Sequence, residues 1–304
     1  MQLPWHLLWS AIISLFLFSC NSSEKDTLAV RSEIKTEANT SETRALSQDF
    51  KKYWYAGTAE ITSYKLIQER YGELREGTSV NIFVTEDFIP EVQVKANNPG
   101  KKNIPVLKLN NTKKYLTGIY PYSVMTSTFS PVQTNDHALK VTHSMQEWCG
   151  QVYVQLNNRR NFEIQAHSYF EGEADQQIDL PKSWMESDLW SRIRINPEEL
   201  PTGNFSILPS FEYFRMSHKK IATHTATASL MKGDSISSYS LSYTDLDREL
   251  KIYFSSQFPY TIERWEETHA NGLKTTAEKM KRMRSAYWGQ NSNKYSSLRD
   301  SLGL

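Results

Sequence analysis

The fold is decided by the stretch Val152-Tyr153-Val154-Gln155-Leu156, Asn157-Asn158-Arg159-Arg160-Asn161 and Phe162-Glu163-Ile164-Gln165-Ala166. Apolar and polar residues alternate with a period of two in the first and third runs, which is the pattern of a strand with one buried face. The polar run between them is short enough to be a turn between two strands. This stretch therefore predicts two adjacent antiparallel strands.

Strand-like segments recur along most of the chain after Phe50. They lie at residues 59–66, 78–85, 92–96, 104–109, 115–129, 138–145, 212–216, 220–230, 237–244, 249–257 and 261–267. Short polar turns separate most of them, whereas parallel strands need long crossover connections, so an antiparallel sheet is favoured. In one of these segments Leu250, Ile252 and Phe254 are expected to face the core.

Two segments interrupt the strand pattern and predict helices. Residues 183–194 carry Met185, Leu189 and Ile193 at four-residue spacing, and residues 196–200 resemble a capped single turn. Residues 273–287 predict a C-terminal helix with a basic face, exposed to solvent or placed near anionic headgroups. The expected fold is mainly β: a large antiparallel curved sheet or open barrel, with a crossover segment near 183–200 and a C-terminal helix.

The N-terminus carries an apolar run of 12 residues, from Leu7 to Phe18. Such a run is too short to span a bilayer but fits the core of a signal peptide. The following residues complete Leu17-Phe18-Ser19-Cys20, which resembles the lipobox of bacterial lipoproteins, whose cysteine is diacylated and becomes the first residue after cleavage. We expect residues 1–19 to be a lipoprotein signal peptide and Cys20 the lipidation site. The alternatives are an ordinary secretory signal and a buried or membrane-lying N-terminal helix.

Acyl chains on Cys20 would hold the protein at a membrane without a transmembrane helix, because two or more chains give stable anchoring. Residues 20–49 are rich in Ser, Thr, Glu and Lys and have few large apolar side chains, so they are expected to form a flexible tether. Residues 50–304 are long enough for a single β-rich domain, with the alternative of two sub-sheets that meet near 180–208.

Composition excludes some functions. The formal net charge of +1 argues against nucleic acid as a partner, because such binders usually show a strong basic excess. The chain has two cysteines. If Cys20 is acylated, Cys149 is the only remaining thiol, and no intramolecular disulfide can form.

Cys149 is the first candidate nucleophile, with His143 and Glu147 close to it in sequence. A catalytic pair needs the imidazole within hydrogen-bond reach of the sulfur. Six residues of strand place His143 and Cys149 about 20 Å apart. We therefore expect Cys149 to be a small buried apolar residue, which is the commonest role of a free cysteine.

Other chemistry-bearing patterns are weak. The histidines lack metalloprotease or zinc-ribbon spacing, and no hydrolase, P-loop or dinucleotide-binding motif is present. Carboxylates on expected strands are interpreted as solvent-facing; they are Glu60, Glu163, Glu212 and Glu263. No catalytic, metal-binding or cofactor-binding residue is predicted. The many Tyr and Trp residues suit core packing, with a lipid-enclosing sheet or a stacking surface for glycan as alternatives.

Four segments resemble a known family. They are Tyr53-Trp54-Tyr55-Ala56-Gly57-Thr58-Ala59-Glu60-Ile61, Gly118-Ile119-Tyr120-Pro121-Tyr122-Ser123, Met145-Gln146-Glu147-Trp148-Cys149-Gly150 and Ala286-Tyr287-Trp288-Gly289-Gln290-Asn291-Ser292. These are similar to segments of a Bacteroidota lipoprotein family whose members are often labelled "septum formation inhibitor Maf". Genuine Maf proteins are cytoplasmic nucleotide pyrophosphatases with an N-terminal Ser-rich and Arg-rich phosphate motif, which this chain lacks. The resemblance therefore implies an envelope lipoprotein and not that activity.

Together these features predict a lipid-anchored lipoprotein of the cell envelope, at the outer membrane on its periplasmic or surface side. It would contact the membrane through acyl chains on Cys20 and act as a binding or scaffolding module for a lipid, a glycan or an envelope protein. The alternative is an envelope hydrolase or transferase whose site is assembled only in space. The expected architecture also resembles periplasmic domains that wrap a sheet around a helix, such as the lipoprotein-carrier fold, which by itself says nothing of function.

Overall fold

The computed structural model describes residues 43–304. The expected signal peptide, Cys20 and residues 20–42 of the expected tether lie outside the described residues. The α-helices of the described range are α1 (Gln48–Trp54), α2 (Glu186–Ile195) and α3 (Phe211–Ser217). The 3₁₀ segments are η1 (Pro197–Glu199), η2 (Thr244–Leu246), η3 (Tyr287–Gly289) and η4 (Asn293–Leu302). None of these helices is long and apolar enough to cross a membrane.

The strands of the described range are β1 (Ala59–Arg70), β2 (Glu73–Ile89), β3 (Val94–Lys95), β4 (Ile104–Thr117), β5 (Tyr120–Pro131), β6 (Lys140–Glu147), β7 (Gly150–Asn158), β8 (Phe162–Ser168), β9 (Gln176–Leu180), β10 (Trp184–Met185), β11 (Gly203–Leu208), β12 (His224–Met231), β13 (Ile236–Tyr243), β14 (Arg248–Ser255), β15 (Ile262–Thr268) and β16 (Lys274–Ser285). They form one sheet in the order β10-β11-β12-β13-β14-β15-β16-β1-β2-β4-β5-β6-β7-β8-β9, with β3 paired to β2. Only the short β10–β11 pair is parallel among the ladders of the described strands.

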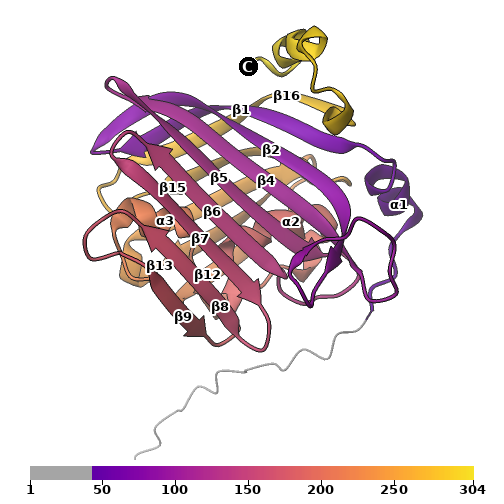
Figure 1. Cartoon of the computed structure of the whole chain (residues 1–304), viewed down its shortest axis with the longest axis horizontal. Coiled ribbons are helices and arrows are strands. Elements are labelled where there is room, and N and C mark those ends of the chain that lie inside the picture. The colour runs from indigo at the N-terminus through magenta and orange to yellow at the C-terminus, as the bar shows by residue number, and fades with distance from the viewer. Residues whose placement is uncertain (1–42) are drawn as a thin grey trace, which may run out of the picture. The chain divides into compact units, whose positions relative to one another are not determined.

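The sheet is strongly curved. Strands β2 to β9 form one wall, strands β12 to β16 lie behind it, and α2 and α3 lie between the two (Figure 1). The pairing of β1 with β16 joins the beginning and the end of the domain. The edges are β9 and β10, which residues 181–183 connect without a ladder between them. The predicted antiparallel curved sheet is therefore confirmed, and it is unclosed.

The hairpin predicted from residues 152–166 is present as β7 and β8. Val154 pairs with Ala166 and Leu156 pairs with Ile164. These four side chains are buried, whereas the alternate residues of both strands are exposed or half-buried. The same alternation buries Leu250, Ile252 and Phe254 on β14, as predicted. Period-two patterning therefore identifies the concave face of the sheet.

The expected helix over 273–287 is wrong, because residues 274–285 form strand β16. Ala277 pairs with Leu66 of β1 on one side and with Trp265 of β15 on the other. Hydrogen bonds from two neighbouring strands thus override an apolar spacing that also suits a helix. A C-terminal helix does occur, later than expected, as η4; the Ser63 hydroxyl donates a hydrogen bond to the Leu302 carbonyl at its end.

The strand expected at residues 212–216 is also wrong, since these residues belong to α3. The Ser210 side chain accepts a hydrogen bond from the backbone N–H of Tyr213 at 3.2 Å, which caps the start of the helix. Ser47 caps α1 in the same way, through the N–H of Phe50 at 3.1 Å. Helix α1 precedes the first strand of the sheet.

Residues 43–49, the described end of the expected tether, contact the domain. The Arg44 guanidinium donates a hydrogen bond to the Val132 carbonyl at 3.0 Å and forms an ion pair with Glu199. The next residues lead into α1, whose Phe50 and Trp54 are buried against Phe83 of β2. The domain therefore begins before Phe50.

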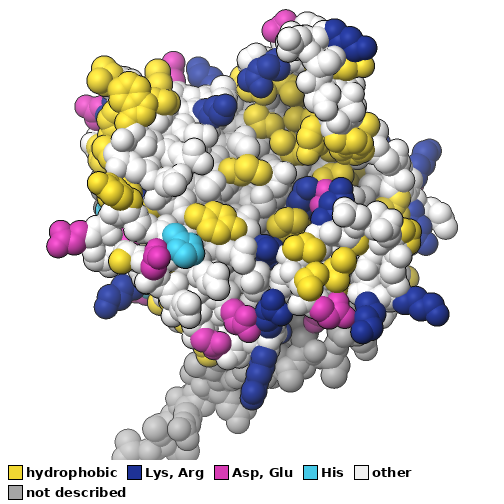
Figure 2. Space-filling model, in the orientation of Figure 1, with side chains coloured by type: hydrophobic (Ala, Val, Ile, Leu, Met, Phe, Trp, Pro, Cys, Tyr) yellow, Lys and Arg dark blue, Asp and Glu magenta, His cyan; other side chains and the backbone are white. Residues whose placement is uncertain are grey.

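The outer face of the β2–β9 wall is shown in Figure 2. White atoms, which are uncharged polar side chains and backbone, cover much of this face, with apolar side chains scattered among them and most charged groups toward the rim. The concave side is different, since a large apolar cluster from both walls surrounds α2 and α3. Buried charged residues are also found there, so the candidate site is sought on the concave side.

Candidate functional site

Helix α2 contributes to three buried ion pairs, two of which attach it to strands of the sheet. Arg194 donates two hydrogen bonds to Glu60 of β1, at 2.6 and 2.8 Å. Arg248 of β14 donates to both oxygens of Glu186, at 2.5 and 2.7 Å. Asp188 and Arg192 pair within the helix at 3.1 Å. All the carboxylates and guanidiniums of these pairs are at least 97% buried.

Glu60 was expected to face solvent, which is wrong. Burial alone would raise the pKa of its carboxyl group, but the Arg194 guanidinium and the Tyr53 hydroxyl lower that pKa overall. The carboxylate is therefore ionised inside the domain. Its role is to fix the carboxyl-terminal half of α2 against β1.

Beside α3 a cleft leads from the surface into the space between the walls. We call it the α3 cleft. Its outer part has a volume of about 340 Å³ and its inner part about 50 Å³. Ser210, Glu212 and Glu267 line both parts, so the two parts are adjacent. The outer volume lies in the range of small-molecule sites, whereas the inner one has room for a few water molecules at most.

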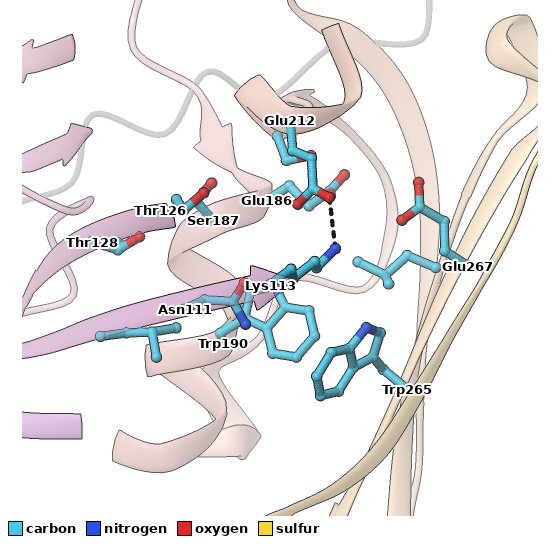
Figure 3. Close-up of a pocket in the computed structure, with 13 residues that line it drawn as sticks. Asn111, Lys113, Thr126, Thr128, Glu186, Ser187, Trp190, Glu212, Trp265 and Glu267 are labelled. Atoms are coloured by element: carbon cyan, nitrogen blue, oxygen red, sulfur yellow. Dashed lines mark hydrogen bonds and ion pairs between the residues drawn. The ribbon is translucent and has the colours of Figure 1, made fainter. Parts of the chain in front are cut away.

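The inner part of the α3 cleft is shown in Figure 3. The Lys113 ammonium of β4 lies 2.8 Å from the Glu212 carboxylate of α3, so one ion pair crosses from the sheet to the helix. Below it the indole rings of Trp190 and Trp265 pack edge to face, with centroids 5.1 Å apart. The inner end is therefore closed by aromatic rings and carries a charged pair near its entrance.

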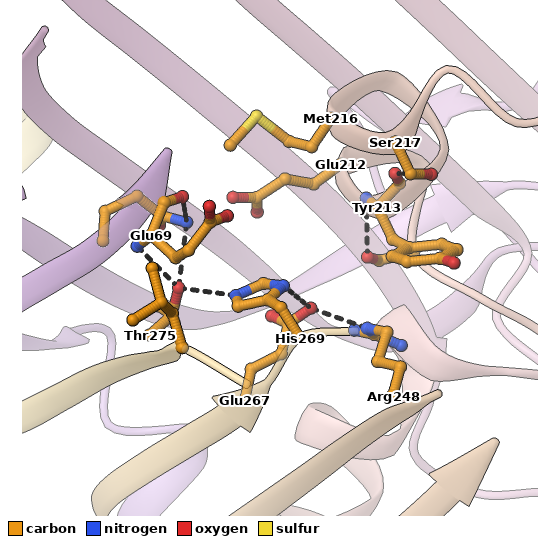
Figure 4. Close-up of polar contacts among 12 residues, drawn as sticks. Glu69, Glu212, Tyr213, Met216, Ser217, Arg248, Glu267, His269 and Thr275 are labelled. Carbon is orange, nitrogen blue, oxygen red and sulfur yellow. Dashed lines mark hydrogen bonds and ion pairs between the residues drawn. The ribbon is translucent and has the colours of Figure 1, made fainter. Parts of the chain in front are cut away.

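The outer part of the α3 cleft holds a polar network, shown in Figure 4. Arg248 donates a hydrogen bond to Glu267 at 2.6 Å. His269 lies between two partners, with Nδ1 at 3.8 Å from the Glu267 carboxylate and Nε2 at 2.9 Å from the Thr275 hydroxyl. Burial would raise the pKa of Glu267, but Arg248, then His269 and Lys113, lower it to about 2. Glu267 is thus a permanent anion and cannot act as a general acid at neutral pH.

Acidic groups dominate the α3 cleft. Its lining contains six carboxylates against three Lys or Arg residues; these are Glu69, Glu186, Glu212, Asp245, Asp247 and Glu267 against Lys113, Lys219 and Arg248. Neither Glu69 nor Asp247 forms an ion pair with another described residue. Glu69 Oε1 already accepts hydrogen bonds from the Gly72 N–H at 3.1 Å and from Asn271 Nδ2 at 3.0 Å. The cleft therefore presents to a ligand the Asp247 carboxylate and the second oxygen of Glu69 as acceptors without a paired cation.

The structure places the candidate thiol outside this cleft. Cys149 lies in the turn between β6 and β7 and is exposed, so the expected burial is wrong. The neighbouring Glu147 carboxylate accepts a hydrogen bond from the Cys149 backbone N–H at 2.6 Å, and bonding to Glu147 raises the pKa of the thiol. A raised pKa disfavours the nucleophilic thiolate.

His143 does not serve that thiol. It lies on β6 with its side chain fully buried, and its Nδ1 is 2.9 Å from the Thr126 hydroxyl. Burial first, then Lys113 and Arg215, lower the pKa of His143 to about 3. A buried imidazole and an exposed thiol cannot form the pair that catalysis requires.

The remaining candidates are scattered. Glu163 pairs with Arg159 at the surface at 3.2 Å, and Glu263 pairs with Lys279. No group of three or more His, Cys, Asp or Glu residues within 43–304 is arranged to hold a metal ion. Of the four carboxylates considered from the sequence, only Glu212 lines the cleft. Sequence reasoning missed Glu267, His269 and Arg248. The capping residue Ser210 marks the start of a helix, and this signal could have placed Glu212 on a helix and not on a strand.

Comparison with known proteins gives little. No family model and no curated protein matches the chain. Among solved structures, the crystal structure of a β-barrel-like protein from Brucella abortus, a domain of unknown function, superposes with a TM-score of 0.45 at 9% identity. The match covers 75% of this chain and 98% of that one. At this level of similarity it adds nothing to the account of the site.

Proposed function

We propose that the protein is a lipid-anchored lipoprotein of the cell envelope that binds a polar ligand in the α3 cleft. The observation that carries the binding role is the α3 cleft itself, with its volume of about 340 Å³ and its excess of carboxylates. The lipobox-like Leu17-Phe18-Ser19-Cys20 and the resemblance to a Bacteroidota lipoprotein family support the anchor. The outer membrane, on its periplasmic or surface side, is the proposed location.

The chemistry of the cleft favours ligands that donate hydrogen bonds. Ionised carboxylates only accept hydrogen bonds, so hydroxyl-rich or ammonium-bearing molecules fit better than anions. At the outer part, Asp247 and the second carboxylate oxygen of Glu69 are available for such contacts. The inner cavity of about 50 Å³ is too small for an acyl chain, so we do not propose a lipid in the cleft.

The anchor is tested by metabolic labelling with an alkyne fatty acid in a bacterial host that processes lipoproteins. The wild-type chain and Cys149→Ala are expected to incorporate the label and to fractionate with membranes, whereas Cys20→Ala incorporates none. Equal labelling of Cys20→Ala, or an unlabelled wild-type chain in the cytoplasm, would contradict the proposal.

The binding role is tested by thermal shift on the full chain, screened against mono- and disaccharides and against diamines. A ligand of the α3 cleft is expected to raise the melting temperature. Asp247→Asn should weaken that shift, while the matched surface variant Glu163→Gln should leave it unchanged. Stabilisation that neither Asp247→Asn nor Glu69→Gln alters, or no stabilisation by either class of compound, would count against this site.

A second candidate function is an envelope hydrolase, because Glu212, Glu267 and His269 converge in one cleft. Since Glu267 stays ionised, His269 would have to carry the proton, with Glu267 orienting it. Assays with nitrophenyl esters and glycosides decide between the two. Turnover that His269→Gln abolishes and Glu163→Gln preserves would favour the hydrolase, and absence of turnover would favour the binding protein.

A further inference from the structure

A second depression lies on the other side of α3, and we call it the Arg215 groove. It has a volume of about 520 Å³ and lies between α3 and strands β7, β8 and β9. Apolar side chains make up half of its walls, among them Val152, Val154, Ala166, Ile178, Phe211 and Phe214. The strand residues among them belong to the concave face, and β9 is an edge strand. The groove is thus an apolar surface next to the unclosed side of the sheet.

Arg215 is the unusual residue of this groove. Its side chain is 5% exposed, yet it forms no ion pair with a described carboxylate. Its Nε has no hydrogen-bond partner within residues 43–304. The guanidinium lies 3.9 Å from the centre of the Phe170 ring, and its one hydrogen bond is a long one of 3.4 Å to His218 Nε2.

A buried guanidinium without a carboxylate is costly, because the charge has lost its water without a compensating anion. The nearest acid in the network is Glu173, which reaches Arg215 only through His218, whose Nδ1 lies 2.5 Å from the Glu173 carboxylate. Lys219 and Lys220 line the groove together with Glu173. The Arg215 guanidinium itself therefore lacks a direct anionic partner, although one carboxylate lies in the groove wall.

We propose that the Arg215 groove binds a fatty acid, with the acyl chain against the apolar walls and the carboxylate against Arg215. A carboxylate matches the planar guanidinium, including the unpartnered Nε, in two parallel hydrogen bonds. Each methylene of the chain that leaves water increases the affinity about fourfold. Of the residues that line this groove, Lys219 also lines the α3 cleft, but Arg215 and the apolar walls do not, so either proposal can fail without the other.

The test is photo-crosslinking of the full chain in lipid nanodiscs. Diazirine-bearing myristic acid is compared with the corresponding diazirine-bearing alcohol, and adducts are mapped by mass spectrometry. The acid is expected to label peptides from residues 152–178 and 211–221 about tenfold more than the alcohol, since one charge-assisted contact is worth about that factor. Equal labelling by acid and alcohol in the wild-type chain would overturn the proposal without recourse to any variant.

Variants sharpen the test. Arg215→Gln should reduce acid labelling to the level of the alcohol, whereas Arg215→Lys should keep most of the preference. Arg160→Gln removes an exposed arginine from the turn between β7 and β8 and should change nothing. Ile178→Trp fills the groove and should reduce labelling by acid and alcohol alike. Undiminished acid labelling of a folded Arg215→Gln chain would show that the guanidinium does not hold the carboxylate.

Discussion

Helices α2 and α3 both lie inside the curved sheet, but they use their charges differently. Four charged side chains of α2 form buried ion pairs with defined partners. On α3, Glu212 pairs with Lys113 at the entrance of a cleft, and Arg215 has no carboxylate partner at all among the described residues. The charged side chains of α2 are all neutralised in buried ion pairs. Those of α3 border the two depressions in which ligands are proposed.

This difference has an energetic meaning. Removing one partner from a buried ion pair strands the other charge away from water, which is expensive. Removing a buried charge that has no partner leaves no other charge unpaired. Mutations of charged residues should therefore differ in their effect on the free energy of unfolding. The loss should be large in α2 and small in α3.

The largest effect is expected for Arg194→Met. This change leaves the Glu60 carboxylate buried without its guanidinium, and such losses usually cost about 3–5 kcal/mol. The measurement is the free energy of unfolding from urea denaturation. Lys232→Met, which breaks an exposed ion pair with Glu198, is the matched control and should cost less than about 1 kcal/mol.

The double variant Glu60→Leu with Arg194→Met separates two explanations. Replacing both charges with apolar side chains often costs little, so the double variant should recover much of the stability lost by Arg194→Met. If Arg194→Met lowers the free energy of unfolding no more than Lys232→Met does, the proposed difference between the charges of α2 and those of α3 is wrong.

These ion pairs show where sequence reasoning stops. Period-two alternation predicted most strands of the sheet, because it records which face of each strand is buried. Glu60 and Arg194 are 134 residues apart, and no local spacing connects them. Glu60 occupies a polar position in the alternating pattern of its strand. From this pattern alone, a carboxylate that faces solvent cannot be distinguished from one that pairs with an arginine inside the domain.

The wrong expectations have a similar cause. Residues 274–285 carry a spacing that suits a helix, but ladders to β1 and β15 decide for a strand. Cys149 was expected to be buried from the general behaviour of free cysteine, although the turn before Gly150 places it outside. Within the α3 cleft, Glu212 could be named from the sequence, but its proximity to Glu267 and His269 depends on how β15 and α3 meet.

The second largest effect concerns His143, which lies near Arg215 and Lys113. Its pKa of about 3 in the folded protein is below the ordinary value of 6.5, so between these values only the unfolded chain binds the proton. Stability is therefore complete above about pH 6.5 and falls as the pH is lowered. Between pH 7 and pH 5 the expected loss is about 2 kcal/mol.

The comparison is with His143→Gln, whose stability should vary less over the same range of pH. His137, whose pKa burial also lowers, is present in both proteins, so the difference between the two curves isolates His143. Parallel curves would mean that the pKa of His143 is not lowered in the folded protein.

A smaller effect is expected for Glu212→Gln. The Lys113 ammonium, 8% exposed, would keep a hydrogen-bond acceptor but lose its anionic partner at 2.8 Å, so the cost should be about 1 kcal/mol in urea denaturation. Glu163→Gln, on an exposed strand position, should cost less. A loss as large as that of Arg194→Met would place Glu212 among the structural charges of the domain, and not among those available to a ligand.

The smallest effect is expected for Arg215→Met in the absence of ligand. The variant removes a desolvated charge that no described carboxylate compensates, and it keeps apolar contact with Phe170, so the free energy of unfolding should change by less than about 1 kcal/mol or increase. The measurement is the same denaturation, repeated with and without myristic acid. The acid should stabilise wild-type protein more than it stabilises Arg215→Met. A loss of several kcal/mol without ligand would show that Arg215 holds the fold as Arg194 does, because only a compensated charge leaves such a deficit when it is removed.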